Sequence, residues 1–237
     1  CRSVLVESAF AAADVPVYDS TLYEGGASLS TADNILRVGR ELGLCSDDAD
    51  TNALVTRGDA AIILHVVLTQ SFRIEEPPVP VTLVNAAGVN INDYLLALRQ
   101  VPEPVLAAFN AAGWTYRIDF DYMGGLSKKL NMSCIGATNY SQKTIYLSEA
   151  SATLHEFGHF LDWMLGFPAE YEQLFRAEAS AAPLRNYAKT DSREYFADCF
   201  AYWVKYAENA NAISLLQECA PMTYRYMEDL MRIANRL

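Results

Sequence analysis

Two histidines and a glutamate in one short stretch have the types and the spacing that bind and use a metal ion. The stretch from Leu154 to Leu165 reads LHEFGHFLDWML, with His155 and His159 four residues apart and Glu156 after the first. On a helix, four residues bring both imidazoles to one face, one turn apart. Two neutral imidazole nitrogens on one face suit a single zinc ion. The HExxH pattern also places Glu156 to take a proton from a zinc-bound water that attacks a carbonyl.

Two histidines on an apolar helix can also be core residues whose nitrogens are bonded within the protein. The composition weighs against this alternative, because the chain has only 3 histidines and two of them lie in the motif. Phe157, Phe160 and Leu161 supply apolar packing for such a helix. Gly158 is less favourable in a helix than alanine by ~1 kcal/mol, so we expect another chain segment to pass close to it.

A catalytic zinc site needs three protein ligands, and no further histidine is well placed in the sequence. The remaining candidates are Glu194 and Asp198, four residues apart at the head of an apolar helix that we predict from Arg193 to Ala207. If this helix packs against the motif helix, one carboxylate can reach the metal. The other can accept the second ring N–H of a ligating histidine. The alternative is that both acids belong to a solvated face.

The surrounding elements predict an α+β domain with few strands and many helices. Alternating patterns predict strands at 81–84, 114–120, 135–140 and 144–147, and helical spacing predicts helices at 92–100, 104–112, 170–179, 193–207 and 224–236. We expect the motif helix to begin near Ser148 and the segment from Gly124 to Ser133 to form turns. The strand from Thr144 to Leu147 is the more apolar of its hairpin, so we expect it to be the more buried.

If the motif hydrolyses peptide bonds, an extended peptide must lie across the metal, and an exposed strand edge can hold such a peptide through main-chain hydrogen bonds. The polar strand before the hairpin turn is the best candidate for such an edge, because it is short and close in sequence to the motif helix. We predict that substrate binds to Gly136, Ala137, Thr138, Asn139 and Tyr140.

A proline-rich, charged junction from Arg73 to Pro80 divides the chain. We predict a small all-helical domain over residues 1–73 and the zinc-site domain over residues 74–237. In the first domain, Thr56 and Asp59 predict a capped helix start. The stretch from Asp14 to Leu68 resembles one repeat of the S-layer homology family, in DVP at 14–16, ELGL at 41–44 and VTRGDA at 55–60. That resemblance implies association with the bacterial cell wall.

The composition excludes several classes of protein. A net charge of −11 argues against a nucleic-acid partner, which requires patches of lysine and arginine. The longest wholly apolar stretches fall far short of the ~20 residues of a membrane span, so we predict none. The chain begins at Cys1, and we therefore expect a processed or cut chain from which any signal sequence has been removed.

The motif and the residues after it match a known pattern. HEFGH, followed by Tyr187 and then by EYFAD at 194–198, resembles the catalytic domain of anthrax lethal factor and the related secreted clostridial proline–proline endopeptidases. The likeness covers roughly residues 75–237. These proteins are gluzincins, which are zinc peptidases that use two histidines and a glutamate as ligands. The resemblance therefore implies a zincin-like fold, with a small mixed sheet and active-site helices.

The resemblance also assigns roles to single residues. It implies His155, His159 and Glu194 as the ligands of one catalytic zinc ion. It implies Glu156 as the general base and Tyr187 as a hydroxyl donor to the oxyanion. Asp198 stands where the family usually has glutamate, and the resemblance gives it a supporting role behind a ligand.

These observations together predict a secreted or cell-surface bacterial zinc endopeptidase that acts on proteins or peptides. The competing hypothesis is a non-catalytic, cell-wall-associated binding or structural protein with a degenerate protease fold. An intact Glu156 argues against that hypothesis, because a binding protein has no use for a general base between two metal ligands.

Overall fold

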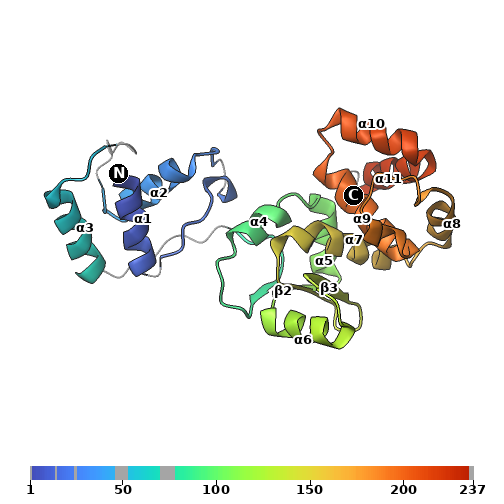
Figure 1. The fold of residues 1–237 in the computed structure, drawn as a ribbon, viewed down its shortest axis with the longest axis horizontal. Coiled ribbons are helices and arrows are strands. Elements are labelled where there is room, and N and C mark those ends of the chain that lie inside the picture. Colours follow the sequence, from blue (N-terminus) through green and yellow to red (C-terminus); the bar gives the residue numbers. More distant parts are fainter. Residues whose placement is uncertain (1, 14, 24–25, 46–52, 70–77, 235–237) are drawn as a thin grey trace. The chain divides into compact units, whose positions relative to one another are not determined.

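The computed structural model of the protein describes residues 2–13, 15–23, 26–45, 53–69 and 78–234 (Figure 1). The chain divides into two compact units, Cys1–Pro78 and Val79–Leu237. The predicted junction from Arg73 to Pro80 lies mostly outside the described residues, which omit 70–77. The boundary expected between residues 73 and 74 therefore stays a prediction. Among the described residues, no helix combines the length and the apolar character that crossing a membrane requires.

The first unit is helical in its described part. It contains α1 (Arg2–Ala12), the short 3-10 helix η1 (Ser20–Leu22), α2 (Thr31–Glu41) and α3 (Arg57–Thr69). The predicted helix start at Thr56 is confirmed. The Thr56 amide donates to Asp59 Oδ2 at 2.9 Å, and the Asp59 amide donates to Thr56 Oγ1 at 3.1 Å. This reciprocal pair satisfies backbone donors that the first turn of a helix leaves without partners.

A mixed four-stranded sheet, in the order β1-β2-β4-β3, forms the centre of the second unit. Its strands are β1 (Leu83–Asn85), β2 (Thr115–Ile118), β3 (Gly136–Asn139) and β4 (Thr144–Leu147). The first two pairs are parallel, and β3 runs antiparallel to β4 at the edge of the sheet. Every residue of β4 is buried, whereas every residue of β3 is only half-buried. The α+β fold class and the greater burial of β4 are confirmed.

Helices cover both faces of this sheet, with α6 on one side and α5 and α7 on the other (Figure 1). The helices of the second unit are α4 (Asn92–Leu98), α5 (Glu103–Ala111), α6 (Phe120–Leu130), η2 (Ala150–Ala152), α7 (Thr153–Met164), α8 (Ala169–Glu178), η3 (Asn186–Lys189), α9 (Ser192–Lys205), α10 (Ala210–Cys219) and α11 (Pro221–Ala234). The sequence patterns did not predict α6 or α10.

The segment from Gly124 to Ser133, expected to form turns, lies mainly in helix α6. The Asp119 side chain caps the start of the helix by accepting the Tyr122 amide at 2.9 Å. The helix ends at Leu130, and the next residue, Asn131, has a φ of 52°, the left-handed conformation common after a last turn. The two glycines lie on the exposed side, while the Tyr122 ring stacks on Tyr146 of β4 at 3.7 Å. The cap and this packing offset the cost of the glycines.

The motif helix α7 begins at Thr153, five residues later than predicted. The amides of Ser148 and Glu149 instead donate to the Ile135 carbonyl, at 2.9 and 3.4 Å, and so continue the strand pairing. The 3-10 helix η2 fills the next turn. Long-range pairing of the backbone therefore overrides the local helix signal at this end.

The register of the sheet decides which side chains face the motif helix. Thr138 pairs with Ile145, and Ile145 pairs with Tyr116, so these three side chains share one face. The Tyr116 hydroxyl lies 2.7 Å from Thr153 Oγ1, which identifies this face as the one that α7 covers. Side chains of β3 on either side of Thr138 therefore face α6.

A buried aromatic cluster fixes the position of α7. The ring of Phe157 lies 4.9 Å from Phe109 of α5, and the ring of Phe160 lies 5.2 Å from Trp114 next to β2. All four side chains are at most 1 % exposed, and such aromatic pairs contribute beyond their buried area. With its inner face held in this way, α7 presents its histidines toward α9.

Candidate metal centre and active site

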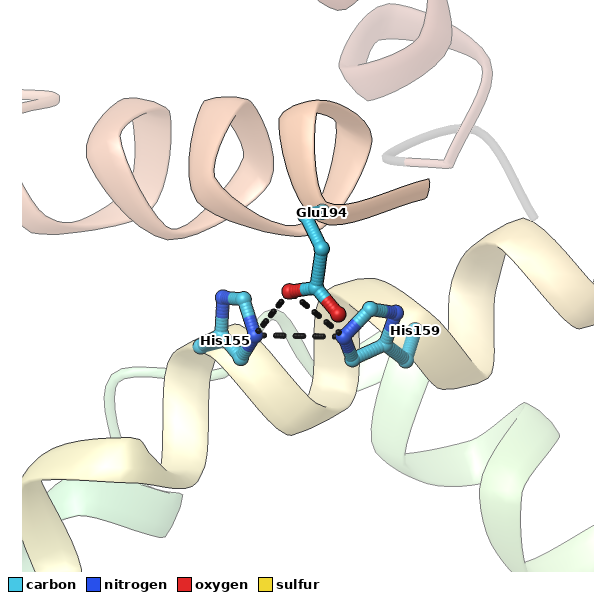
Figure 2. Close-up of side chains that lie close together, drawn as sticks. All are labelled: His155, His159 and Glu194. Carbon is cyan, nitrogen blue, oxygen red and sulfur yellow. Dashed lines mark hydrogen bonds and ion pairs between the residues drawn. The ribbon is translucent and has the colours of Figure 1, made fainter. Parts of the chain in front are cut away.

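Helix α7 brings the two motif histidines together, as the spacing predicted. Their Nε2 atoms are 3.1 Å apart, and both residues are buried, at 9 and 8 % exposure (Figure 2). Two nitrogens at this distance and one helical turn apart can share a single ligand or ion.

Helix α9 adds the carboxylate of Glu194 to this pair. Its Oε2 lies 3.1 Å from His155 Nε2 and 3.4 Å from His159 Nε2 (Figure 2). The start of α9 is fixed by Asp191, whose Oδ1 accepts the amides of Arg193 and Glu194 at 2.9 and 3.0 Å. Asp191 is thus engaged as a helix cap, and Glu194 is the acid that reaches the histidines.

Gly158 explains how α9 comes so close to α7. A Cβ added at this glycine would lie 2.6 Å from the Cα of Ala197 and 2.8 Å from its carbonyl oxygen. The expected close approach of another segment at Gly158 is therefore confirmed. Because Glu194 precedes Ala197 by less than one turn, this contact places the carboxylate over the histidines.

The three atoms have the donor types and the separations of a zinc site. Four ligands at ~2.05 Å in a tetrahedron are ~3.3 Å apart, and the observed distances are 3.1, 3.1 and 3.4 Å. Glu194 Oε2 is buried without a hydrogen-bond partner, although it lies close to both histidines. A buried carboxylate oxygen facing two imidazole nitrogens leaves electron pairs that a cation would satisfy. Among the described residues, this cluster was the one found with such an arrangement.

The carboxylates around His155 stabilise positive charge at this site. Burial lowers its pKa, but the neighbouring carboxylates of Asp198, Glu194 and Glu156 raise it to about 9. Burial raises the pKa of Glu194, and its contacts with the two histidines outweigh that effect and hold the pKa well below its usual range. The site is therefore an acidic pocket that favours bound cations, and a metal would compete there with protons.

Asp198 supports His155 from the side away from the cluster. Its Oδ1 accepts the Nδ1–H of His155 at 2.7 Å, so Nε2 is the nitrogen that faces the other two groups and can bind a metal once the metal displaces its proton. The Asp198 side chain is 8 % exposed. Its second partner is Arg185, which donates from Nε to Oδ2 at 2.6 Å and from Nη2 to Oδ1 at 2.7 Å.

Arg185 was not among the predicted site residues. It lies just before η3, outside any periodic element, and its neighbours in sequence give no sign of a partner 13 residues further on. A lone arginine in a loop is usually solvated, so no signal in the sequence could have singled it out.

Glu156 lies beside the cluster, at 4 % exposure, and contacts β3. Thr138 donates from Oγ1 to Glu156 Oε2 at 2.7 Å. A Cβ added at Gly136 would lie 2.5 Å from Glu156 Oε1, so the glutamate fits against bare backbone there. The side chain of Thr138 thus contacts the glutamate, and the predicted binding of substrate to its main chain stays a prediction.

The predicted substrate edge lines a cleft of about 940 Å³ that also contains the cluster. Gly136, Ala137, Thr138 and Tyr140 line this cleft, whereas Asn139 borders a second, open groove beside α6. Leu126 and Leu130 of α6, a helix that the sequence did not predict, also line the cleft. The edge position of β3 is confirmed, and its role in binding stays a prediction.

Tyr187 lies in η3 at the rim of the same cleft, at 42 % exposure. Its ring centroid is 6.2 Å from that of His155. Burial and the nearby Glu194 carboxylate raise the pKa of Tyr187 to about 12. The hydroxyl therefore keeps its proton at neutral pH and remains able to donate a hydrogen bond.

Part of the chain is similar to a known family. Residues 117–230 match the family described as anthrax toxin lethal factor, N- and C-terminal domain. The chain is also similar to the solved structure of the PRO-PRO endopeptidase PPEP-2 from Paenibacillus alvei, with a TM-score of 0.49 and 19 % identity, over 62 % of this chain and 96 % of that one. No curated protein matches the chain.

The family match covers the residues that carry the predicted site. Residues 117–230 thus form a domain similar to the lethal factor family, which confirms that part of the predicted resemblance. The stretch from Asp14 to Leu68 lies outside the matched range, and its resemblance to an S-layer homology repeat stays a prediction.

Proposed function

We propose that this protein is a zinc-dependent endopeptidase. The observation that carries the proposal is the convergence of His155, His159 and Glu194 at zinc-like separations, with Glu156 beside them in an open cleft. The similarity of residues 117–230 to the lethal factor family supports a metallopeptidase. In the proposal, the two histidines and Glu194 hold one zinc ion, and Asp198 fixes the orientation of the first histidine.

The side chains divide the work of peptide hydrolysis. Zinc, when bound, supplies a Lewis acid that polarises a carbonyl group and acidifies water. Glu156 accepts the proton of the attacking water at its carboxylate and passes it to the leaving amine. Tyr187 donates its hydroxyl proton in a hydrogen bond to the developing oxyanion. Its pKa of about 12 keeps that proton available.

The free edge of β3 suits an extended peptide. The strand is the last of its sheet, and the cleft that borders it also contains the cluster. A peptide paired with this edge would place a backbone carbonyl near Glu156, because the glutamate touches β3 through Thr138. Proteins or peptides in extended conformation are therefore the proposed substrates.

Zinc content and cleavage of a peptide library together test the proposal. We expect one zinc ion per chain and cleavage that stops when a chelator removes the ion. Glu156→Gln keeps the shape of the side chain but cannot accept the proton, so we expect zinc to stay bound while kcat falls by about 10²–10⁴-fold. A zinc-loaded wild-type protein that cleaves no member of the library, or a Glu156→Gln variant with normal turnover, would refute the peptidase assignment.

The proposal extends to location through the first unit. Its resemblance to an S-layer homology repeat supports a secreted or cell-surface enzyme that associates with bacterial cell wall. Sedimentation of the protein with purified Gram-positive cell walls measures this directly. Protein that stays in the supernatant at all wall concentrations would remove wall association from the proposal and leave the peptidase part intact.

A further inference from the structure

Arg185 makes the shortest ion pair of the site, with Asp198. Its Nε and Nη2 donate to the two oxygens of Asp198 at 2.6 and 2.7 Å. Two parallel N–H bonds to one carboxylate need the planar fork of a guanidinium, which lysine lacks. The pair is therefore specific to arginine in its geometry as well as in its charge.

Asp198 depends on this fork to hold its orientation. Its carboxylate is 8 % exposed and accepts hydrogen bonds from His155 and Arg185. Without Arg185, Asp198 loses both hydrogen bonds from the guanidinium, including the bond to Oδ2. A buried carboxylate that loses such a partner rotates or draws water into the site, because an unpaired buried charge is costly.

The orientation of Asp198 decides which nitrogen of His155 is free. A carboxylate only accepts hydrogen bonds, so the 2.7 Å contact requires a proton on Nδ1. In the neutral ring, which is the form that binds a metal, the lone pair is then on Nε2, and this atom faces His159 and Glu194. The Nη2 of Arg185 also lies 3.0 Å from His155 Nδ1. Because the proton of Nδ1 is donated to Asp198, that nitrogen cannot accept a hydrogen bond from the guanidinium. Arg185 therefore acts on the metal-binding nitrogen through Asp198.

The same guanidinium also contacts Tyr187. Its central carbon lies 5.3 Å from the centroid of the tyrosine ring, within the range of a cation–π contact. The ring is 42 % exposed at the rim of the cleft, and the side chain also hydrogen-bonds Glu194. Arg185 is thus in contact with both the support of a ligand and the proposed hydroxyl donor.

We propose that Arg185 is a positioning residue that fixes Asp198 against His155, so that Nε2 faces the metal, and holds the Tyr187 ring at the cleft. The role of Arg185 in holding Tyr187 rests on the proposed function. Its role in fixing Asp198 involves metal binding alone and applies to any metal at this cluster.

The sign of the effect on zinc affinity separates this proposal from plain electrostatics. Removing a positive charge close to a divalent ion should tighten zinc binding if Arg185 acts only through its charge. If Arg185 positions Asp198, its removal should weaken zinc binding, by about 10–100-fold for the loss of such support. We therefore expect Arg185→Met to lose zinc affinity.

The experiment measures zinc affinity of the full chain by competition with a chromophoric chelator at fixed pH. Arg185→Lys keeps the charge but not the fork, and we expect an affinity between those of the wild type and Arg185→Met. Arg176→Met is the matched control, because Arg176 forms an exposed ion pair with Glu172 in α8, and its zinc affinity should equal that of the wild type. Zinc affinity in Arg185→Met equal to or above that of the wild type overturns the proposal.

A double-mutant cycle tests the route through Asp198. In the Asp198→Asn background, we expect Arg185→Met to change zinc affinity by less than about twofold, because the support is already lost. An unchanged effect of Arg185→Met in that background would show that Arg185 acts by another route. Thermal unfolding of the metal-free variants identifies any that fail to fold, and Arg185→Lys then carries the comparison.

Kinetics test the contact with Tyr187. On any peptide that the wild type cleaves, we expect Arg185→Met at saturating zinc to lower kcat more than it changes KM. Equal kcat values would remove Tyr187 from the role of Arg185. A wild-type protein without cleavage activity whose Arg185→Met variant still loses zinc affinity would refute the proposed function and leave the positioning role standing.

Discussion

Replacing Gly158 by alanine should damage the metal site without touching a ligand. The new methyl group would lie 2.6 Å from the Cα and 2.8 Å from the carbonyl oxygen of Ala197 in α9. Both atoms belong to the backbone of a helix, so neither can turn away as a side chain would. The two helices must therefore move apart, or the backbone around this contact must adopt a strained geometry.

The size of that movement follows from the contact. Ordinary contact begins at 3.4 Å, so the helices must separate by about 0.8 Å (3.4 minus 2.6 Å) at this point. Metal–ligand distances tolerate only about ±0.2 Å, and Glu194 lies less than one turn from Ala197. We expect zinc affinity to fall by about tenfold or more. Overpacking costs about 1–3 kcal/mol, and the better helix propensity of alanine returns about 1 kcal/mol.

The measurement combines zinc affinity with thermal unfolding of the metal-free protein. Gly125→Ala is the matched control, because Gly125 is an exposed helical glycine of α6 with nothing within 4 Å of an added Cβ. We expect this control to gain up to about 1 kcal/mol and to keep its zinc affinity. If Gly158→Ala binds zinc as the wild type does and gains stability as Gly125→Ala does, the contact between α7 and α9 does not set the ligand geometry.

Three further predictions follow from the contacts of the second unit. Thr138→Val removes the hydroxyl that donates to Glu156. Because a hydrogen bond to a charged group contributes about 1.5–3 kcal/mol, we expect kcat/KM to fall about 10–100-fold at unchanged zinc content, whereas Thr138→Ser should stay active. Full activity in Thr138→Val would refute a positioning role for this hydroxyl. Asp119→Ala removes the cap of α6 and should lower the free energy of unfolding by about 1 kcal/mol in urea; an unchanged midpoint would contradict this. Burial raises the pKa of Asp162 from 3.8 to about 6, so the folded metal-free protein holds this proton at higher pH than the unfolded chain. Its stability should therefore fall as the pH rises from about 4 to about 6. The melting temperature of Asp162→Asn should lack that contribution, and identical pH profiles for the two proteins would show that this carboxyl is not perturbed.

Local patterns in the sequence determined the parts of the protein that depend on neighbours along the chain. The spacing of His155 and His159 predicted one shared helical face, because the period of a helix is fixed by its own backbone. Thr56 and Asp59, which are three residues apart, predicted the start of a helix. The alternation around the hairpin predicted β3 and β4. Gly158 predicted a close approach, although its sequence could not name the segment that approaches.

Where local signals competed with contacts distant in sequence, the predictions of secondary structure were wrong. The glycines of α6 and the polar segment around them suggested turns, but the Asp119 cap and the stacking of Tyr122 on β4 make a helix. The start of α7 was placed five residues early, because the amides of Ser148 and Glu149 pair with Ile135, which precedes them by more than ten residues.

Tertiary structure alone decided how the site is assembled. From the residues themselves, Glu194 and Asp198 were equivalent candidates for the metal. The contact of α9 with α7 places the Glu194 carboxylate against both histidines and the Asp198 carboxylate against Nδ1 of His155. Arg185 joins the site through Asp198, 13 residues further along the chain, and the Thr138 hydroxyl joins it through Glu156 of α7, 18 residues further along. Periodicity shows which residues share a face, but which faces meet is set by packing between elements far apart in the chain.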